Sequence, residues 1–390
     1  MSSVAREMME PARAANAAAS ASAITLVARQ VSGADWDTII GSFDEVCQEQ
    51  THAFAKTRWP DVGQEPVIFQ RGATVVGGAL VMIQPLPLGL GKMAVVKWAP
   101  MLASAGSAEA EALRAAMVDC LTRDYAEKRG MMLSVLLHAS PDEINAGYHA
   151  LRQRGFQRGS TLLFPNRYMV RLRLSDDDLR KSFHQTWRRQ LNKAEKSNLE
   201  FSRSEPGEIG DFKALYAAMT ERKQFPDHSA YETLDVLMGL DEPLRPELFF
   251  VRHEGETVAG ALIFKAGQRA VYLYGATNDK ALPLRAGYFL HWQVIRWLRD
   301  NARAQWYDLG GTDGFQGLHQ FKAGMVGTAG VIRPVPPVLN RATSPWAGFL
   351  GNAAFTARDV LQHTRRHLDG LRSSKARPDQ APHIWDESFR

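Results

Sequence analysis

Short apolar runs alternate with amphipathic stretches along most of the chain, a pattern typical of an α/β (α+β) protein. Strand-like runs at 67–81 and 249–264 each divide around a polar turn, which predicts a β-hairpin in both places. Apolar residues recur at helical spacing within 109–130 and 287–302, which predicts an amphipathic helix in each segment. The pattern therefore predicts sheets with helices packed on them.

These elements recur in the same order in the two halves of the chain. VVGGAL at 75–80 matches TVAGAL at 257–262, and each hairpin leads to further strands, a helix and a short apolar strand. The glycines inside these strands, Gly77, Gly78 and Gly260, indicate points where another group approaches the backbone closely. We interpret this order as an internal duplication, in which each half is a mixed central sheet flanked by helices.

The length of the chain, 390 residues, exceeds the usual size of one domain, so two domains are expected. The start of the chain is rich in Ala and Ser and contains Glu7 and Glu10, which favours a disordered leader over a signal peptide. Prolines after residue 331 are expected to end the fold. The predicted divisions are a leader at 1–23, an N-terminal domain at 24–174, a C-terminal domain at 175–335 and a tail at 336–390 that holds a Pro-rich linker and a helix.

The helix predicted in the tail, at 346–372, is amphipathic. An apolar stripe of this kind either docks on the body of the protein or lies on an anionic membrane surface, and the sequence leaves both readings open. The stripe consists of Trp346, Phe349, Leu350, Ala353, Ala357, Val360, Leu361, Leu368 and Leu371.

Composition says more about the cellular compartment of the protein than about its function. The net charge of +5 is compatible with a polyanionic partner without requiring one. Cys47 and Cys120 are far apart and match no metal-ligand or redox spacing, so no metal site is predicted and a reducing compartment is favoured. No apolar run approaches the roughly 20 residues that span a bilayer. We therefore expect a cytoplasmic protein.

The segment 180–203 is locally very basic, with seven Lys and Arg residues against two Glu. Apolar residues within it, including Trp187, recur at helical spacing, so the basic residues are expected on the exposed side of a helix. That side is either an ordinary solvated face or a contact for tRNA phosphates, the phosphates of CoA or another nucleotide, or acidic headgroups. The candidate binding residues are Arg188, Arg189 and Lys193.

The stretch YDLGGTDGFQGLHQFKAG at 307–324 carries the most specific candidate chemistry. A strand ends at Gly310 and Gly311, where backbone N–H groups can face a ligand, and Lys322 could add a positive charge for a phosphate or a developing oxyanion. Asp308 could orient an amine or act as a base, or it could cap the turn.

Four segments in this order resemble the FemA/FemB/FemX family of tandem GNAT-fold aminoacyltransferases. They are WRRQLNKAEKSNLEF, FKALYAAMTERKQF, GYFLHWQVIRWLRD and WYDLGGTDGFQGLHQFKAG. The resemblance implies two tandem GNAT-like domains and an acyltransferase without a tightly bound cofactor, using aminoacyl-tRNA or acyl-CoA as donor. It also implies an acceptor amine on a cell-envelope precursor, either a peptidoglycan peptide or a polysaccharide. A lipid-linked acceptor would bring the protein to the inner face of the membrane.

The same resemblance implies roles for single residues. It makes Lys322 the catalytic or donor-binding lysine, with Phe321 as its neighbour, and it places Arg222 and Tyr274 where the family lines its acceptor groove. The usual GNAT pyrophosphate loop is only partly present around Arg285, and the residues that follow are expected to crowd it, which argues against a simple acetyl-CoA enzyme. Two alternatives remain: an acyl-CoA-dependent N-acyltransferase in exopolysaccharide or envelope synthesis, and a non-catalytic RNA- or membrane-binding module.

Overall fold

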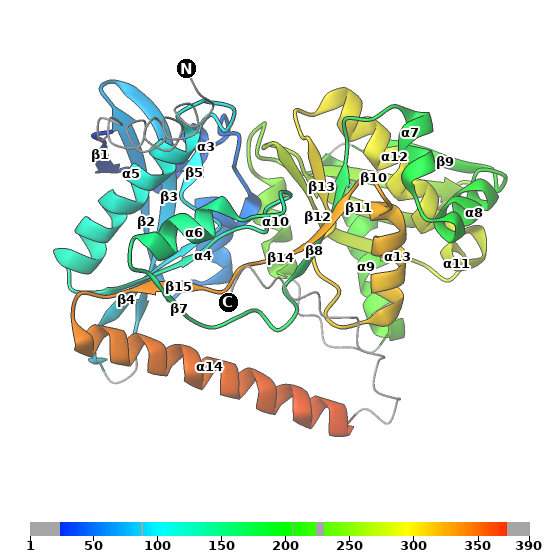
Figure 1. The fold of residues 1–390 in the computed structure, drawn as a ribbon. Coiled ribbons are helices and arrows are strands. Elements are labelled where there is room, and N and C mark those ends of the chain that lie inside the picture. The colour runs from blue at the N-terminus through cyan, green and yellow to red at the C-terminus, as the bar shows by residue number, and fades with distance from the viewer. Residues whose placement is uncertain (1–23, 87–88, 205, 224–229, 373–390) are drawn as a thin grey trace, which may run out of the picture.

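The computed structural model describes residues 24–86, 89–204, 206–223 and 230–372, which form two sheets with helices packed on them (Figure 1). The first sheet has the order β1-β2-β3-β4-β6-β15-β7, with β5 paired to β3. Its strands are β1 (Val27–Gln30), β2 (Gly63–Arg71), β3 (Thr74–Pro85), β4 (Lys92–Lys97), β5 (Met101–Leu102), β6 (Met132–Leu136), β7 (Gln157–Arg158) and β15 (Leu339–Arg341). The helices around it are α3 (Gly33–Ile40), α4 (His52–Arg58), α5 (Ala110–Leu121), which continues as a π-helical turn (Thr122–Glu127), and α6 (Ala146–Gln153).

The second sheet has the order β14-β8-β13-β12-β11-β10-β9. Its strands are β8 (Asn166–Arg171), β9 (Leu199–Ser204), β10 (Glu247–His253), β11 (Glu256–Phe264), β12 (Arg269–Thr277), β13 (Trp306–Asp308) and β14 (Val331–Pro334). The helices around it are α7 (Asp176–Ser182), α8 (Gln185–Ala194), α9 (Ile209–Lys223), α10 (Leu234–Met238), α11 (Ala281–Leu284), α12 (Ala286–Asn301) and α13 (Gln316–Val326). Short 3-10 turns lie at Gln48–Gln50, Pro206–Glu208 and Tyr231–Thr233.

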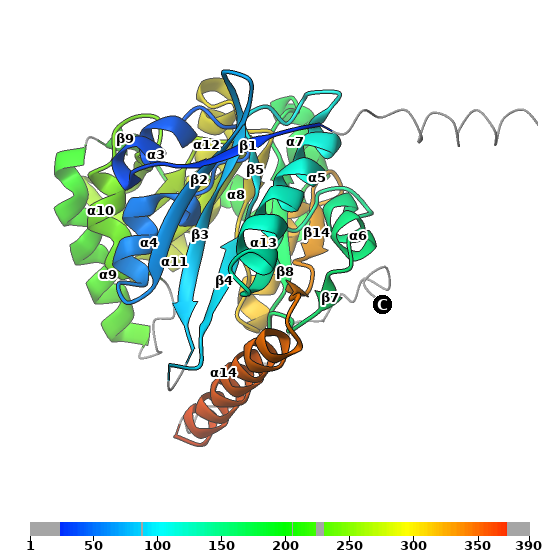
Figure 2. The same ribbon diagram turned by 90° about the vertical axis from the view of Figure 1, so that its left-hand side faces the viewer.

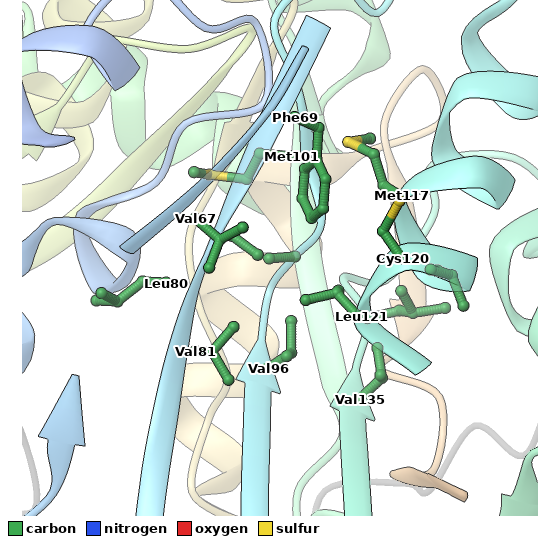
Figure 3. Close-up of a cluster of buried hydrophobic side chains, with 14 of the residues drawn as sticks. Val67, Phe69, Leu80, Val81, Val96, Met101, Met117, Cys120, Leu121 and Val135 are labelled. Atoms are coloured by element: carbon green, nitrogen blue, oxygen red, sulfur yellow. The ribbon is translucent and has the colours of Figure 1, made fainter. Parts of the chain in front are cut away.

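The two sheets repeat one plan, as the sequence predicted. Each contains a long antiparallel hairpin, β2–β3 or β10–β11, and a parallel pair, β4–β6 or β12–β13, joined through a helix. The strand glycines lie at close approaches: a Cβ on Gly78 would stand 2.7 Å from the Trp36 ring, and one on Gly260 would stand 3.0 Å from Phe250. Figure 3 shows the apolar core between the first sheet and α5, where Met117 and Leu121 face Val96 and Val135.

The predicted domain boundaries need correction at both ends of the second domain. β8 was assigned to the N-terminal domain at 24–174, but it pairs with β13 and β14 in the second sheet. β15 was assigned to the tail at 336–390, but it pairs with β6 and β7 in the first sheet. The prolines after residue 331 therefore do not end the fold, because the chain crosses back to the first sheet beyond them. The predicted leader at 1–23 and the last residues, 373–390, lie outside the described part of the chain.

The basic segment forms two helices instead of one. Ser175 caps α7 by accepting a hydrogen bond from the backbone N–H of Asp178, and the acidic first turn complements the helix dipole. The helix breaks at Phe183, whose ψ of 148° is extended, and α8 begins after it. Trp187 and Leu191 on α8 are buried against the second sheet, so the predicted apolar stripe is confirmed.

The tail helix, α14 (Pro345–Arg372), projects from the body of the protein (Figure 2). It contacts the body through its first half, where Gly351 lies against Met132 and the partly buried Phe355 packs against buried apolar residues. Within the predicted stripe, Leu350 packs against buried residues of the body, whereas Trp346 is 60% and Phe349 is 64% accessible. Docking on the body therefore leaves these two aromatic residues of the stripe uncovered. Within the described residues, no helix is long and apolar enough to cross a bilayer.

Candidate functional site

Lys322 lies on α13 with its side chain directed at the loop that follows β13. The residue is only 9% exposed, and its ammonium group donates to the backbone carbonyl of Leu309 at 2.6 Å and to that of Gly311. The side chain thus ties the helix to the point where the strand ends. Because an ammonium group has three protons, one donor remains for a further partner.

Burial lowers the pKa of Lys322 to about 8. The charges around it act in both directions: the carboxylates of Asp313 and Asp308 raise this pKa, and the guanidinium of Arg167 lowers it. Lys322 therefore titrates close to neutral pH, unlike a surface lysine, which is the behaviour expected of a group that functions in a desolvated site.

Local strand geometry opens this site. β12 and β13 pair in parallel over only three residues, and the chain then turns away at Gly310, which has a positive φ of 74° that glycine adopts without strain. A Cβ on Gly310 would lie 3.4 Å from the Arg167 guanidinium and 4.0 Å from the Lys322 ammonium. Gly310 therefore faces two cations. Gly311 lies on the other side of the turn, near the backbone carbonyls of Phe164 and Asn166.

Asp308 is 3% exposed and has two partners in the protein. One carboxylate oxygen accepts a hydrogen bond of 2.8 Å from the backbone N–H of Gly310, and the other lies 3.6 Å from the Arg269 guanidinium. These contacts make Asp308 the cap of the turn. The sequence allowed either a turn cap or a catalytic group at Asp308, and these contacts are those of a turn cap.

A cavity of 520 Å³ lies between the two sheets, and Arg269, the partner of Asp308, is one of its lining residues. It forms where β4 and β6 stop pairing, after Lys97 and Leu136. The first domain contributes Trp98, Arg114 and His138 to its wall, and the second contributes Arg269, Gln305 and Trp306. Arg269 lines the cavity and pairs with Asp308, which accepts a hydrogen bond from Gly310. This chain of contacts links the cavity wall to the loop that Lys322 binds.

His138 is an ionisable group in the wall of the cavity. Its ring stacks on Trp98 at 4.7 Å with an interplanar angle of 13°. Burial holds the pKa of His138 well below its ordinary value, and four nearby cations lower it further: Arg269, Arg167, Arg114 and Lys97. The imidazole is therefore neutral at physiological pH.

Phe321 packs in the apolar core beside Lys322. Its ring lies 5.0 Å from Tyr288, 5.5 Å from His291 and 6.2 Å from Trp187. Burial lowers the pKa of His291 to about 3, with Lys322 adding to the effect, so this ring is neutral as well. The packing makes Phe321 an anchor for α13.

The lysine and its loop lie in a segment with a clear sequence match. Residues 181–323 match the family model described as "Acetyltransferase (GNAT) domain". This segment of the second half is therefore similar to GNAT acetyltransferase domains. No curated protein matches the sequence.

The solved structures extend this result to both halves. FemX superposes with a TM-score of 0.65 at 15% identity, covering 80% of this chain and 96% of FemX. The chain has the tandem GNAT fold of FemX. A conserved protein of unknown function from Bacteroides thetaiotaomicron (TM-score 0.52, 14% identity) covers 81% of this chain and 98% of its own. The C-terminal domain of a putative lysylphosphatidylglycerol synthetase from Agrobacterium fabrum (0.50, 13%) covers 83% and 96%.

The predicted basic residues of the GNAT domain have different surroundings. Arg188 donates to the backbone carbonyls of Lys181 and Phe183, so it bridges the break between α7 and α8. Arg189 and Lys193 are exposed on α8. Neither side chain has a hydrogen bond or an ion pair among the described residues, so both are available to an anionic partner.

The other predicted binding residues have partners of their own. Arg222 pairs with Asp279 and donates to the Thr277 carbonyl. Tyr274 is buried under α9, and its hydroxyl donates to the Ala230 carbonyl at 2.6 Å. Arg285 adopts a left-handed conformation before α12 and donates to the Leu282 carbonyl. Within the described residues none of the three is hydrogen-bonded or ion-paired to Lys322 or Asp308.

The two residues expected to crowd the start of α12 pack toward the core. Tyr288 contacts the rings of Trp187 and Phe321, and Phe289 is buried in the core of the second domain. Beyond its chain neighbours and the backbone of its own helix, no atom lies within 4 Å of the Cβ position of Gly287.

Sequence reasoning missed three residues around the site, Trp98, Arg167 and Arg269. Each is a single residue in an unremarkable strand or turn, far in sequence from Lys322. Only the repeat offered a signal, because Trp98 follows β4 and Arg269 begins β12, the corresponding strands of the two halves.

Proposed function

We propose that the protein transfers an activated acyl or aminoacyl group from a donor to an amine on a cell-envelope precursor. The amine nitrogen attacks the donor carbonyl carbon and a C–N bond forms. The bond from that carbon to the leaving oxygen of an aminoacyl-tRNA, or to the sulfur of an acyl-CoA, breaks. The proton lost by the amine passes to the leaving group. The observation that carries this proposal is the buried Lys322 at the strand opening of the GNAT domain.

Lys322 would act on the negative charge of the donor. Two of its protons hold the carbonyls of Leu309 and Gly311, so the ammonium is fixed before substrate arrives. A fixed donor in a desolvated site stabilises a developing oxyanion or a phosphate more than a mobile surface lysine does. Asp308 and Arg269 then have a positioning role, since they fix the turn that carries Gly310.

One observation favours aminoacyl-tRNA as the donor, and another favours acyl-CoA. Exposed Arg189 and Lys193 on α8 favour a long polyanion such as tRNA, because neither cation has a protein partner among the described residues. Gly287 in the first turn of α12 favours the second candidate, an acyl-CoA, because a residue without a side chain near a helix start lets phosphate groups approach the backbone N–H groups. The two donors differ in how strongly transfer should depend on salt and on α8.

A donor comparison tests the proposed function. Purified protein is supplied with aminoacyl-tRNA or acyl-CoA and with peptide and amino-sugar acceptors, and amide formation is followed by mass spectrometry. We expect transfer from tRNA, with Arg189→Glu raising KM about tenfold and Arg29→Glu, an exposed arginine of β1, having no effect. Transfer only from acyl-CoA would select the second candidate. Salt-dependent RNA binding without transfer from either donor would contradict an enzyme and favour a binding module.

A lipid-linked acceptor would give the exposed stripe of α14 a purpose. We propose that Trp346 and Phe349 insert into the interface of an anionic membrane, as amphipathic helices with aromatic residues do. Trp346→Ser combined with Phe349→Ser is expected to weaken binding to vesicles containing phosphatidylglycerol at least about tenfold, because two large apolar side chains are lost. Val27→Ser, at an exposed residue of β1, is the control. Equal binding by both variants, or self-association through the stripe in light scattering, would contradict membrane contact.

A further inference from the structure

Arg167 is a partly buried cation at the junction of the two domains. It lies on β8, the strand by which the chain first enters the second sheet, and its guanidinium lies 5.5 Å from the centroid of the Trp98 ring of the first domain. Among the described residues the guanidinium group has no hydrogen bond and no ion pair, although its charge contributes to lowering the pKa of Glu49. Neighbouring cations differ: Lys97 pairs with Glu49 and Arg114 with Glu45.

Lys322 likewise has no ion pair with a carboxylate among the described residues. Its hydrogen bonds are to two backbone carbonyls, and no carboxylate is hydrogen-bonded to it in the described residues. The nearby Asp308 carboxylate is occupied by the Gly310 N–H and by Arg269. Asp313 is exposed at the surface of the loop. The positive charge of Lys322 is therefore not matched by a bound anionic side chain.

The two cations converge on one point. The Cβ position of Gly310 is 3.4 Å from an Arg167 guanidinium nitrogen and 4.0 Å from the Lys322 nitrogen. The Arg167 charge lowers the pKa of Lys322, which shows that the two cations repel each other, and an anion bound between them would relieve this repulsion. Glycine leaves the space beside both cations free, which any larger residue would occupy.

We propose that Arg167 and Lys322 together bind one anionic phosphate group of a substrate, at the Gly310 turn between the two domains. Arg167 supplies a planar fork that matches phosphate oxygens, and Lys322 supplies a point charge from the opposite element. The Trp98 ring of the first domain lies 5.5 Å from the Arg167 guanidinium, so the first domain also contributes to the surroundings of the site. The claim that the phosphate belongs to a substrate rests on the proposed function. The claim that the two cations bind an anion does not depend on it.

Calorimetry with inorganic pyrophosphate tests this site directly. We expect the unmodified protein to bind pyrophosphate, and Arg167→Met and Lys322→Met each to weaken binding by about 10- to 100-fold, the usual effect of losing a charge-assisted hydrogen bond. Arg167→Lys should recover part of the loss, because charge returns without the fork. The matched control is Arg171→Met, which removes an exposed arginine from the same strand. No binding by the unmodified protein, or equal loss in Arg167→Met and Arg171→Met, would overturn the proposal.

A second readout does not depend on any ligand. Because the Arg167 charge lowers the pKa of Lys322, Arg167→Met should raise that pKa, whereas Arg171→Met should leave it unchanged. The pH dependence of competitive acetylation of Lys322, followed by mass spectrometry, measures the shift. An unshifted titration in Arg167→Met would show that the two cations do not share a site.

Competition separates the sources of the phosphate. CoA and tRNA represent the donor, and a nucleoside diphosphate sugar represents the acceptor. The true source should displace pyrophosphate from the unmodified protein, and its own affinity should fall in Arg167→Met. Pyrophosphate binding that depends on Arg167, in a protein that transfers no acyl group, would uphold the site and contradict the proposed function. Transfer with unchanged kinetics in Arg167→Met would do the reverse.

Discussion

Lys322→Met is expected to lower kcat for acyl transfer by about 10²- to 10³-fold, the usual effect of removing one oxyanion donor. The substitution removes the fixed positive charge at the Gly310 turn and keeps an unbranched side chain of similar length. It also leaves the carbonyls of Leu309 and Gly311 without their donor, which costs about 1–3 kcal/mol of stability. Steady-state kinetics and urea unfolding of the same preparation measure both effects.

The control for this substitution is Lys280→Met. Lys280 is a surface lysine paired with Glu256, so its loss should change neither rate nor fold appreciably. A fall in kcat far larger than the fall in folded fraction assigns the effect to chemistry. If Lys322→Met transfers the acyl group as fast as the unmodified protein, with the true donor and acceptor, Lys322 has no role in the mechanism.

The pH dependence follows from the same residue. Lys322 loses its charge as pH rises through about 8, so transfer should decline above that pH, and Lys322→Arg should shift the decline to higher pH. Stability moves in the opposite direction. The folded-state pKa is lowered from 10.5 to about 8, so the unfolded state binds more protons between these values. The free energy of unfolding attributable to Lys322 therefore increases with pH across that window, and this increase is absent in Lys322→Met.

The sequence predicted the elements of each half because their signals are local. Alternation and helical spacing identified the two hairpins and the helices α5 and α12. The glycines after β13 predicted a turn, and the structure connects Lys322 to that turn by hydrogen bonds. The turn and the lysine lie within one contiguous segment, so their local arrangement could be predicted from the residues of that segment alone.

The pairing of β8 and β15 could not be read in the same way. Both are short strands, and nothing in their residues states which of two similar sheets they join. Their crossing places Arg167 beside Trp98 and Lys322, residues that are far from it in sequence. The inter-domain cavity is likewise made by loops from both halves, so periodicity carries no information about it.

Amphipathicity was informative about α14 only up to a limit. It identified the apolar stripe, which the structure contains, but it could not identify what covers the stripe. Contact with the body uses Gly351, where the absence of a side chain allows the helix to approach Met132. Leu350 and Phe355 also pack against buried residues of the body, so the docked side includes apolar residues that the helical spacing did not separate from the exposed ones.

Asp308→Ala is expected to lower the free energy of unfolding by about 3–5 kcal/mol, because it leaves the buried Arg269 charge without its counter-ion. It also removes the acceptor for the Gly310 N–H. Asp308→Asn keeps a side-chain oxygen for that N–H and should cost clearly less. Urea unfolding of both variants gives the comparison, and Asp300→Ala, at an exposed carboxylate, serves as control.

The same pair of variants decides between a positioning and a catalytic role for Asp308. A carboxylate that only fixes the turn can be replaced by an amide with modest loss, so Asp308→Asn should retain most of the transfer rate. Its 3% exposure and its two protein partners leave little access for an acceptor amine, which is the physical reason for this expectation. A folded Asp308→Asn with a rate as low as that of Lys322→Met would instead show that the carboxylate takes part in proton transfer.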